Sequence, residues 1–81
     1  MADIDVVLQS GAREFYDDVA TATDRLLINQ ALADLSENPS PDGRTKHRLP
    51  ASMLYRDQRL WILYEMLNAF TISVLGIGTV E

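Results

Sequence analysis

The stretch SMLYRDQRLWILYEMLNAFTISVLG, residues 52–76, decides the fold, because it predicts three consecutive strands. Each run is rich in aliphatic, β-branched and aromatic residues, and short polar steps at Asp57-Gln58 and Asn68-Ala69 separate the runs. Short turns between such runs are typical of an antiparallel meander. The three predicted strands are SMLY (52–55), LWILYEML (60–67) and FTISVLG (70–76).

Neither face of this predicted meander is polar, although an antiparallel sheet covered on one side normally has one polar face. With two-residue turns, residue 67 pairs with 70, 63 with 74 and 61 with 76, which places Trp61 opposite Gly76. One face then carries Leu54, Trp61, Leu63, Leu67, Phe70, Ile72 and Val74. The other carries Met53, Tyr55, Leu60, Ile62, Tyr64, Met66 and Leu75, with Thr71 and Ser73.

Upstream of the meander, the sequence predicts a strand and two amphipathic helices. DIDVVL (3–8) alternates apolar and polar residues, and apolar residues recur at helical spacing over 12–20 and again over 24–37. A single helix over 12–36 would be roughly 37 Å long, which is too long for so small a sheet. We therefore predict a break near TATD (21–24), with Thr23 or Asp24 capping the second helix.

The predicted order is β-α-α-β-β-β, an α+β fold in which two helices pack on one face of a small antiparallel sheet. Because the helices cover one face only, we expect them to cover the Trp61 face and to leave the Tyr64 face exposed. Exposed apolar surface of that size marks a partner site. The alternative is that the chain's own loop or tail covers it. The candidate partner interface, for a homodimer or a peptide, is Met53, Tyr55, Leu60, Ile62, Tyr64 and Met66.

Length and composition predict one domain over residues 1–81. The chain has no cysteine, which excludes disulfides and thiolate zinc sites. No motif for a metal, nucleotide or other cofactor is present, so we expect none. No apolar run reaches the roughly 18 residues of a membrane helix, and the first residues are acidic where a signal peptide is basic. These features predict a soluble cytoplasmic protein.

Charge is unevenly distributed along this acidic chain. Residues 1–42 hold nine acidic and two basic residues, a net charge of −7, whereas residues 43–81 carry +2. The basic residues of that second part are Arg44, Lys46, Arg48, Arg56 and Arg59. Two interpretations remain open: the five bind RNA or another anion, or they pair with the chain's own acids. The proline-rich loop 37–51 that bears three of them predicts no regular structure, and Arg56 and Arg59 are expected to be cross-strand neighbours.

Three segments resemble the RelE/ParE toxin superfamily: ALADLSENPSPDGRTKHRLP (31–50), MLYRDQRLWILYEM (53–66) and TISVLGIG (71–78). The resemblance spans roughly residues 28 to 79. It implies a type II toxin–antitoxin toxin, neutralised by an antitoxin protein that wraps around it. RelE-like members cut mRNA on the ribosome, whereas ParE-like members inhibit DNA gyrase. A catalytically silent protein-interaction module on the same scaffold is the alternative.

The resemblance also suggests candidate catalytic residues. Lys46 and Arg48 match loop positions that contact RNA in RelE-like members, and a metal-free ribonuclease needs such cations to stabilise the phosphate. Trp61 stands where the family has an arginine, and Thr79-Val80 replaces a final His-Arg, so ribonuclease activity is left open. The candidates are Lys46, Arg48, Arg56 and Tyr64, with His47 as a further possible base.

Overall fold

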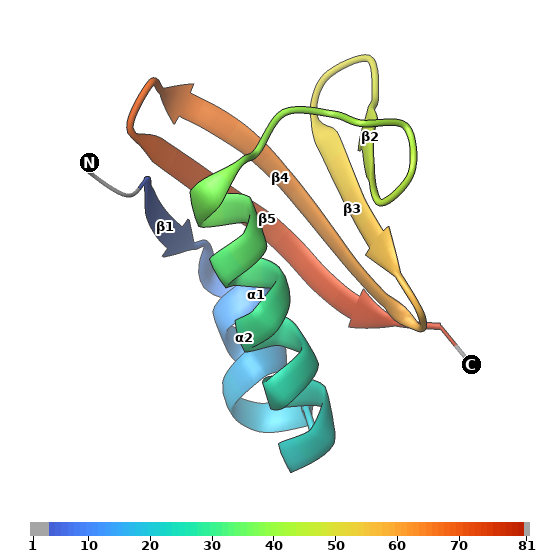
Figure 1. Ribbon diagram of the computed structural model, residues 1–81. Helices are drawn as coiled ribbons and strands as arrows, with labels where there is room; N and C mark the ends of the chain where they lie inside the picture. Colours follow the sequence, from blue (N-terminus) through green and yellow to red (C-terminus); the bar gives the residue numbers. More distant parts are fainter. Residues whose placement is uncertain (1–3, 81) are drawn as a thin grey trace.

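The structure, a computed structural model, describes residues 4–80 and has the predicted α+β architecture (Figure 1). Helices and strands follow in the expected order, with one additional short strand before the meander. The elements are β1 (Asp5–Leu8), α1 (Ser10–Glu14), the π-helical turn η1 (Phe15–Val19), α2 (Ala22–Glu37), β2 (Lys46–Arg48), β3 (Met53–Asp57), β4 (Leu60–Asn68) and β5 (Thr71–Thr79).

The sheet has five strands in the order β1-β5-β4-β3-β2. The predicted meander forms its centre, but the sheet is mixed, because β1 runs parallel to β5 at one edge. The other edge is β2, which lies inside the loop that we expected to have no regular structure. Its three residues fall between the prolines at 41 and 50 and pair with β3, His47 opposite Leu54.

The register of the central hairpin differs from the prediction by two residues at its far end. Trp61 lies opposite Gly78 rather than Gly76, and Leu63 lies opposite Gly76. The turn begins one residue later than expected, after Asn68, and the pairing shifts again between Leu63 and Tyr64. Such irregularities add residues to one strand of a pair, so constant two-residue pairing could not hold along the whole hairpin.

The predicted break between the helices is confirmed, although its cap differs. Ala20 is extended, with φ −65° and ψ 135°, and ends the first helical segment. Thr21, rather than Thr23 or Asp24, is the N-cap of α2: its hydroxyl accepts a hydrogen bond from the Asp24 N–H at 3.1 Å. The Asp24 carboxylate accepts in return from the Thr21 N–H at 3.1 Å, which completes a capping box.

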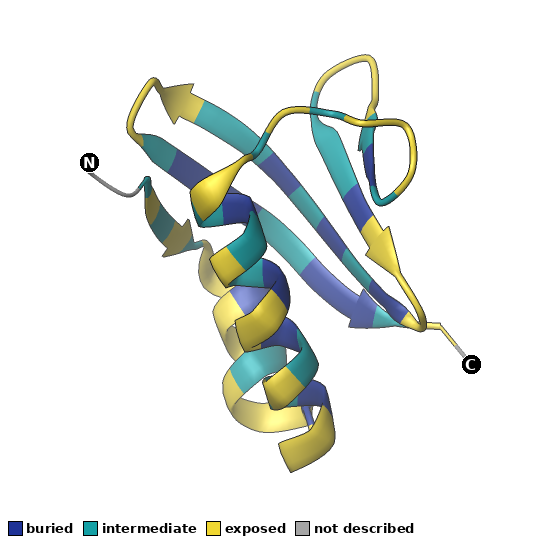
Figure 2. Ribbon diagram, in the orientation of Figure 1, coloured by how far each residue is buried: buried dark blue, intermediate teal, exposed yellow. Residues whose placement is uncertain are grey.

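The helices cover the Tyr64 face of the sheet, so the prediction that they cover the Trp61 face was wrong. Tyr64 and Ile62 are fully buried, and Figure 2 shows the buried positions of the sheet in bands beneath the helices. Two small buried helical residues, Ala12 of α1 and Ala31 of α2, let the helices pack close to this face. The buried core consists of Ala12, Ala20, Ile28, Ala31, Leu35, Tyr55, Leu60, Ile62, Tyr64, Ile72, Val74 and Ile77.

All six residues predicted to form the partner interface lie on this covered face. Tyr55, Leu60, Ile62 and Tyr64 are buried, and Met53 and Met66 are partly buried against the same core. The chain's own helices therefore take the place that we had assigned to a partner. No helix within residues 4–80 has the length and apolar character needed to cross a membrane.

Candidate functional site

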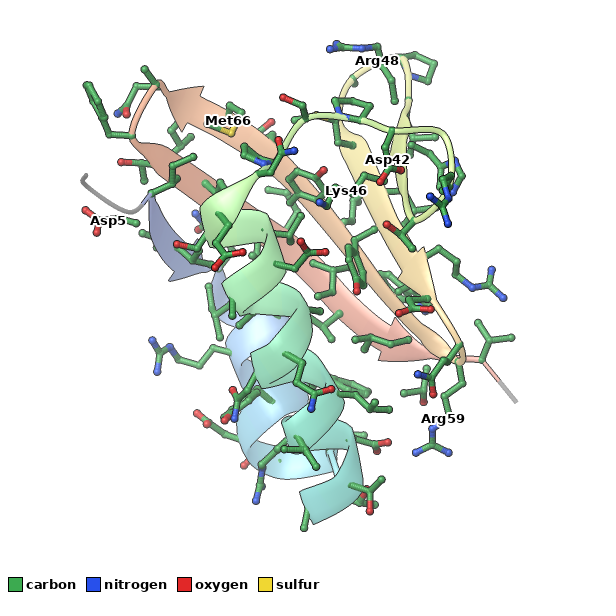
Figure 3. The ribbon with its side chains drawn as sticks, viewed as in Figure 1. Asp5, Asp42, Lys46, Arg48, Arg59 and Met66 are labelled. Atoms are coloured by element: carbon green, nitrogen blue, oxygen red, sulfur yellow. The ribbon has the colours of Figure 1, made fainter. Side chains whose placement is uncertain are left out.

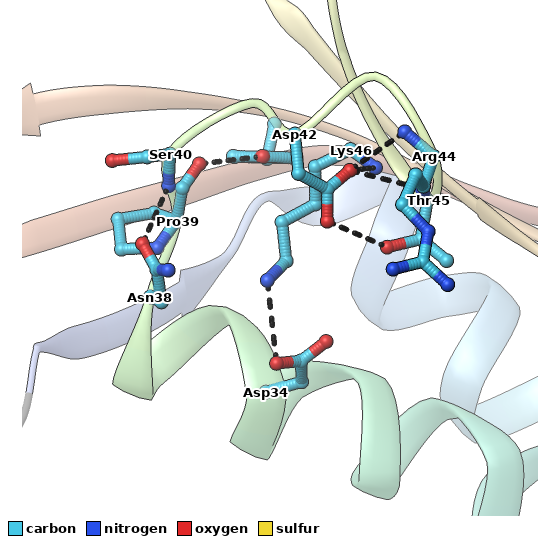
Figure 4. Close-up of polar contacts among 9 residues, drawn as sticks. Asp34, Asn38, Pro39, Ser40, Asp42, Arg44, Thr45 and Lys46 are labelled. Atoms are coloured by element: carbon cyan, nitrogen blue, oxygen red, sulfur yellow. Dashed lines mark hydrogen bonds and ion pairs between the residues drawn. The ribbon is translucent and has the colours of Figure 1, made fainter.

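The basic loop between α2 and β3 is built around the carboxylate of Asp42 (Figure 4). Its Oδ1 atom accepts hydrogen bonds from the N–H groups of Arg44 at 2.8 Å, Thr45 at 3.0 Å and Lys46 at 3.0 Å. The N–H groups of Asp42 and Gly43 both donate to the Lys46 carbonyl at 2.9 Å. Gly43 adopts φ +74°, which a glycine accommodates without strain.

The anion that these backbone N–H groups bind is the loop's own Asp42 carboxylate. Hydrogen bonds from Lys46 and Arg44 hold the pKa of the Asp42 carboxyl at about 2, well below its usual value of 3.8. The backbone donors that could surround a phosphate therefore already bind a carboxylate. The loop is a closed structural unit rather than a preformed phosphate site.

Lys46, the first predicted catalytic cation, is buried and paired. Lys46 is 5% exposed, and its Nζ atom lies 3.3 Å from Oδ1 of Asp34 on α2. Figure 4 shows the side chain pointing from β2 toward the helix. Lys46 thus joins the loop to α2, in agreement with the interpretation that basic residues pair with the chain's own acids.

Tyr64 lies beneath the same loop. Its hydroxyl donates a hydrogen bond of 2.8 Å to the Pro39 carbonyl, and the residue is 0% exposed. Burial, together with the nearby Asp42 and Asp34 carboxylates, raises the pKa of Tyr64 to about 12. A phenol that is buried, donating and so weakly acidic is unsuited to take a proton from RNA at neutral pH.

Arg59 is also paired with an acidic residue of the helices. It lies in the β3–β4 turn and forms a salt bridge with Asp24, the residue that completes the α2 capping box. The hydrogen bond from the Thr21 backbone and the one from Arg59 lower the pKa of the Asp24 carboxyl. Arg56 pairs across the sheet with Trp61, so the expectation that Arg56 and Arg59 are cross-strand neighbours was wrong.

The five basic residues do not converge on one site. Among the five, Lys46 and Arg59 form the salt bridges found within residues 4–80. Arg44, Arg48 and Arg56 are exposed and take part in neither. Arg48 lies at the end of β2 far from the turn that carries Arg59, as Figure 3 shows. Their distribution does not form the single anion site that the sequence suggested. No cluster of three or more metal-ligating side chains occurs in the described part of the chain.

The sheet face opposite the helices is open, and sequence reasoning misjudged it. Two rows of paired residues cross it: His47, Leu54, Leu63 and Gly76, and then Arg56, Trp61 and Gly78. Leu54, Trp61 and Leu63 are partly exposed there, beside the exposed Arg56. We call this surface the open face. The apolar pattern on both faces predicted such a surface, but it did not reveal which face remained uncovered.

Comparison with known proteins places this geometry in a known fold. No family model matches the chain, and no curated protein is significantly similar in sequence. A solved chain from the toxin–antitoxin complex RelBE2 of Mycobacterium tuberculosis superposes with a TM-score of 0.77. The alignment covers 96% of this chain and 99% of that chain, at 18% identity.

The two chains share one fold. The likeness extends over almost all of both molecules, so it includes the helix pair as well as the sheet. The α+β architecture predicted from the sequence is thereby confirmed, and it matches the fold of that RelBE2 chain. The roles of individual residues stay predictions.

Proposed function

We propose that this protein is the toxin or toxin-like component of a type II toxin–antitoxin pair. The observation that carries the proposal is the match, over nearly the full length of both chains, to a component of a toxin–antitoxin complex. An antitoxin protein is the partner that this assignment requires. The open face, with Leu54, Trp61 and Leu63 partly exposed, offers apolar surface for such a partner.

We propose further that the protein acts by binding a protein target, such as gyrase, rather than by cutting RNA. The side chains that would do the chemistry are otherwise engaged: Lys46 is paired with Asp34, and Tyr64 donates to a backbone carbonyl. A net charge of −5 also opposes docking on ribosomal RNA. Cleavage of mRNA is the second candidate, and the exposed guanidinium groups of Arg44, Arg48 and Arg56 favour it.

The test is controlled expression of the chain in a bacterial host, alone and together with the product of the neighbouring reading frame. We expect growth arrest with the chain alone and recovery when both proteins are made. Transcript ends mapped after induction should remain unchanged, and DNA supercoiling by purified gyrase should be inhibited. Normal growth at high expression, without any copurifying neighbour product, would contradict the toxin assignment.

The same experiment separates the two candidate targets. New transcript ends that appear within minutes of induction, with gyrase unaffected, would favour mRNA cleavage instead. The double variant Arg48→Ala with Arg56→Ala is then the informative one, because both residues are exposed and their loss leaves the core intact. Arrest that persists in this variant, with cleavage abolished, would show that binding alone arrests growth.

A further inference from the structure

Strand β4 continues beyond the end of its pairing with β3. The β3–β4 register ends at Met53 opposite Tyr64, whereas β4 runs on beside β5 as far as Asn68. Residues 65–68 therefore have a strand on one side only. An unpaired strand edge presents backbone donors and acceptors to any extended segment that approaches it.

The alternation of backbone groups along β4 directs the N–H of Met66 toward this unpaired side. Along an antiparallel strand these groups alternate between the two neighbours. The Arg59 carbonyl accepts from the Val80 N–H at 2.6 Å, which directs residues 59, 61, 63 and 65 toward β5. Residues 60, 62, 64 and 66 point the other way, and the first three of these meet β3. Met66 is the one for which β3 supplies no partner.

A cleft of about 380 Å³ lies along this edge. Glu65 and Met66 of β4 form one wall and the 49–52 turn forms the other, with Arg48 also lining it. The Leu49 N–H donates to the Ser52 carbonyl at 2.9 Å, which folds the turn back on itself. The chain before β3 therefore does not fill the position that a longer β3 would occupy. We call this feature the edge cleft.

Charged groups line the edge cleft, and exposed apolar residues follow Met66 in the chain. Leu67 is 56% exposed and Phe70, in the following turn, is 70% exposed. Arg48 is exposed and takes part in no salt bridge found within residues 4–80. Side chains alternate along β4, so Glu65 lies on one face of the sheet and Met66 on the other. Arg48 lies on the Met66 side, because it pairs with Met53, which is opposite Tyr64.

We propose that the edge cleft binds an extended peptide segment of a partner protein, which adds to β4 as a further strand. The segment would pair with the backbone of Met66 and place a carboxylate toward Arg48, with an adjacent basic or polar side chain toward Glu65. Main-chain pairing supplies affinity in such complexes, and alternate side chains supply specificity. Assigning the segment to an antitoxin rests on the proposed function, whereas the site itself does not.

The test uses a phage-displayed library of random twelve-residue peptides, selected on the immobilised full-length chain. Selected peptides are synthesised and added to ¹⁵N-labelled protein. We expect the exchange of the Met66 amide to slow at least tenfold, while the Trp61 amide, already directed toward β5, is unchanged. We also expect Arg48→Glu to weaken binding about tenfold, equivalent to about 1.4 kcal/mol. The matched variant Arg44→Glu, outside the cleft, should bind within about twofold of the parent.

A second pair of variants tests the backbone contact directly. Met66→Pro removes the outward N–H without removing a hydrogen bond to β5, so binding should be lost while the fold is kept. Met66→Leu changes the side chain and keeps the N–H, so binding should persist. If Met66→Pro does not fold, the Met66 amide exchange in the parent protein decides the question by itself.

Three results would overturn the inference. They are a library that yields no binder, selected peptides that protect amides elsewhere and not Met66, and a purified chain that is already a dimer with Met66 protected. The last would assign the edge to a second copy of this chain. None of these affects the growth assay, so a chain that arrests growth but binds no peptide at the edge loses this inference alone.

Discussion

Trp61 covers Gly78 on the neighbouring strand, and the two residues are direct cross-strand partners. A Cβ atom at Gly78 would overlap the indole ring, and one at Gly76 would lie 3.4 Å from the Cζ3 atom of the same ring. The indole ring of Trp61 therefore packs directly against the backbone of the two glycines. This explains how the bulkiest side chain of the meander is accommodated on a face without a helix.

Replacement of Gly78 by alanine should destabilise the protein by about 1–3 kcal/mol, because the ring must leave its position. Gly76→Ala should cost less, since its Cβ comes only into close contact with the ring. Urea unfolding followed by far-ultraviolet circular dichroism measures both values. The double variant Trp61→Ala with Gly78→Ala removes the overlap, so the two effects should not add. Strict additivity would mean that the ring does not occupy this place.

The architecture was predictable because it depends on local patterns. Alternation in residues 52–76 and helical spacing in residues 12–37 gave the element order and the break between the helices. The covered face was not predictable in the same way. It depends on the register of β4 against β5, and the shift between Leu63 and Tyr64 that changes this register has no recognised local signal.

The candidate site was only partly predictable, because its contacts join residues distant in sequence. Arg59 and Asp24 are 35 residues apart, and Lys46 and Asp34 are 12 apart. The charge pattern indicated that pairing within the chain was one of two outcomes, but it could not select the partners. The burial of Tyr64 follows from the choice of face, so its role could not be judged before the fold was known.

Tyr64→Phe should leave growth arrest unchanged and lower the free energy of unfolding by about 0.5–1.5 kcal/mol, the usual contribution of one hydrogen bond. The hydroxyl donates to the Pro39 carbonyl and does not reach solvent. Urea unfolding measures the stability, and induced expression measures the arrest. If the variant is folded but no longer arrests growth, Tyr64 acts in the chemistry and its structural assignment fails.

Asp42→Ala should destabilise the protein at neutral pH and progressively less in acid. Because the folded-state pKa of Asp42 is lowered from 3.8 to about 2, its contribution is complete above the unfolded value and is lost as pH falls toward 2. Urea midpoints of parent and variant, measured from pH 7 to pH 2, should therefore converge below pH 4. Asp42→Asn keeps an acceptor without the charge and is the matched control. A gap that stays constant over this range would contradict the assignment.

Truncation of Lys46 should lower the free energy of unfolding far more than truncation of Arg48, two residues away on β2. Lys46→Ala removes a buried methylene stem and should cost about 2 kcal/mol, at about 0.8 kcal/mol for each buried CH₂. Lys46→Met retains most of that stem and should cost less. Arg48→Ala, at an exposed position, should change the free energy of unfolding by no more than about 0.5 kcal/mol. Urea unfolding of the three variants gives the order. If Arg48→Ala destabilises the protein more than Lys46→Ala does, Arg48 supports the fold. If Arg48→Ala leaves stability unchanged, as expected, then any loss of growth arrest in that variant reflects function.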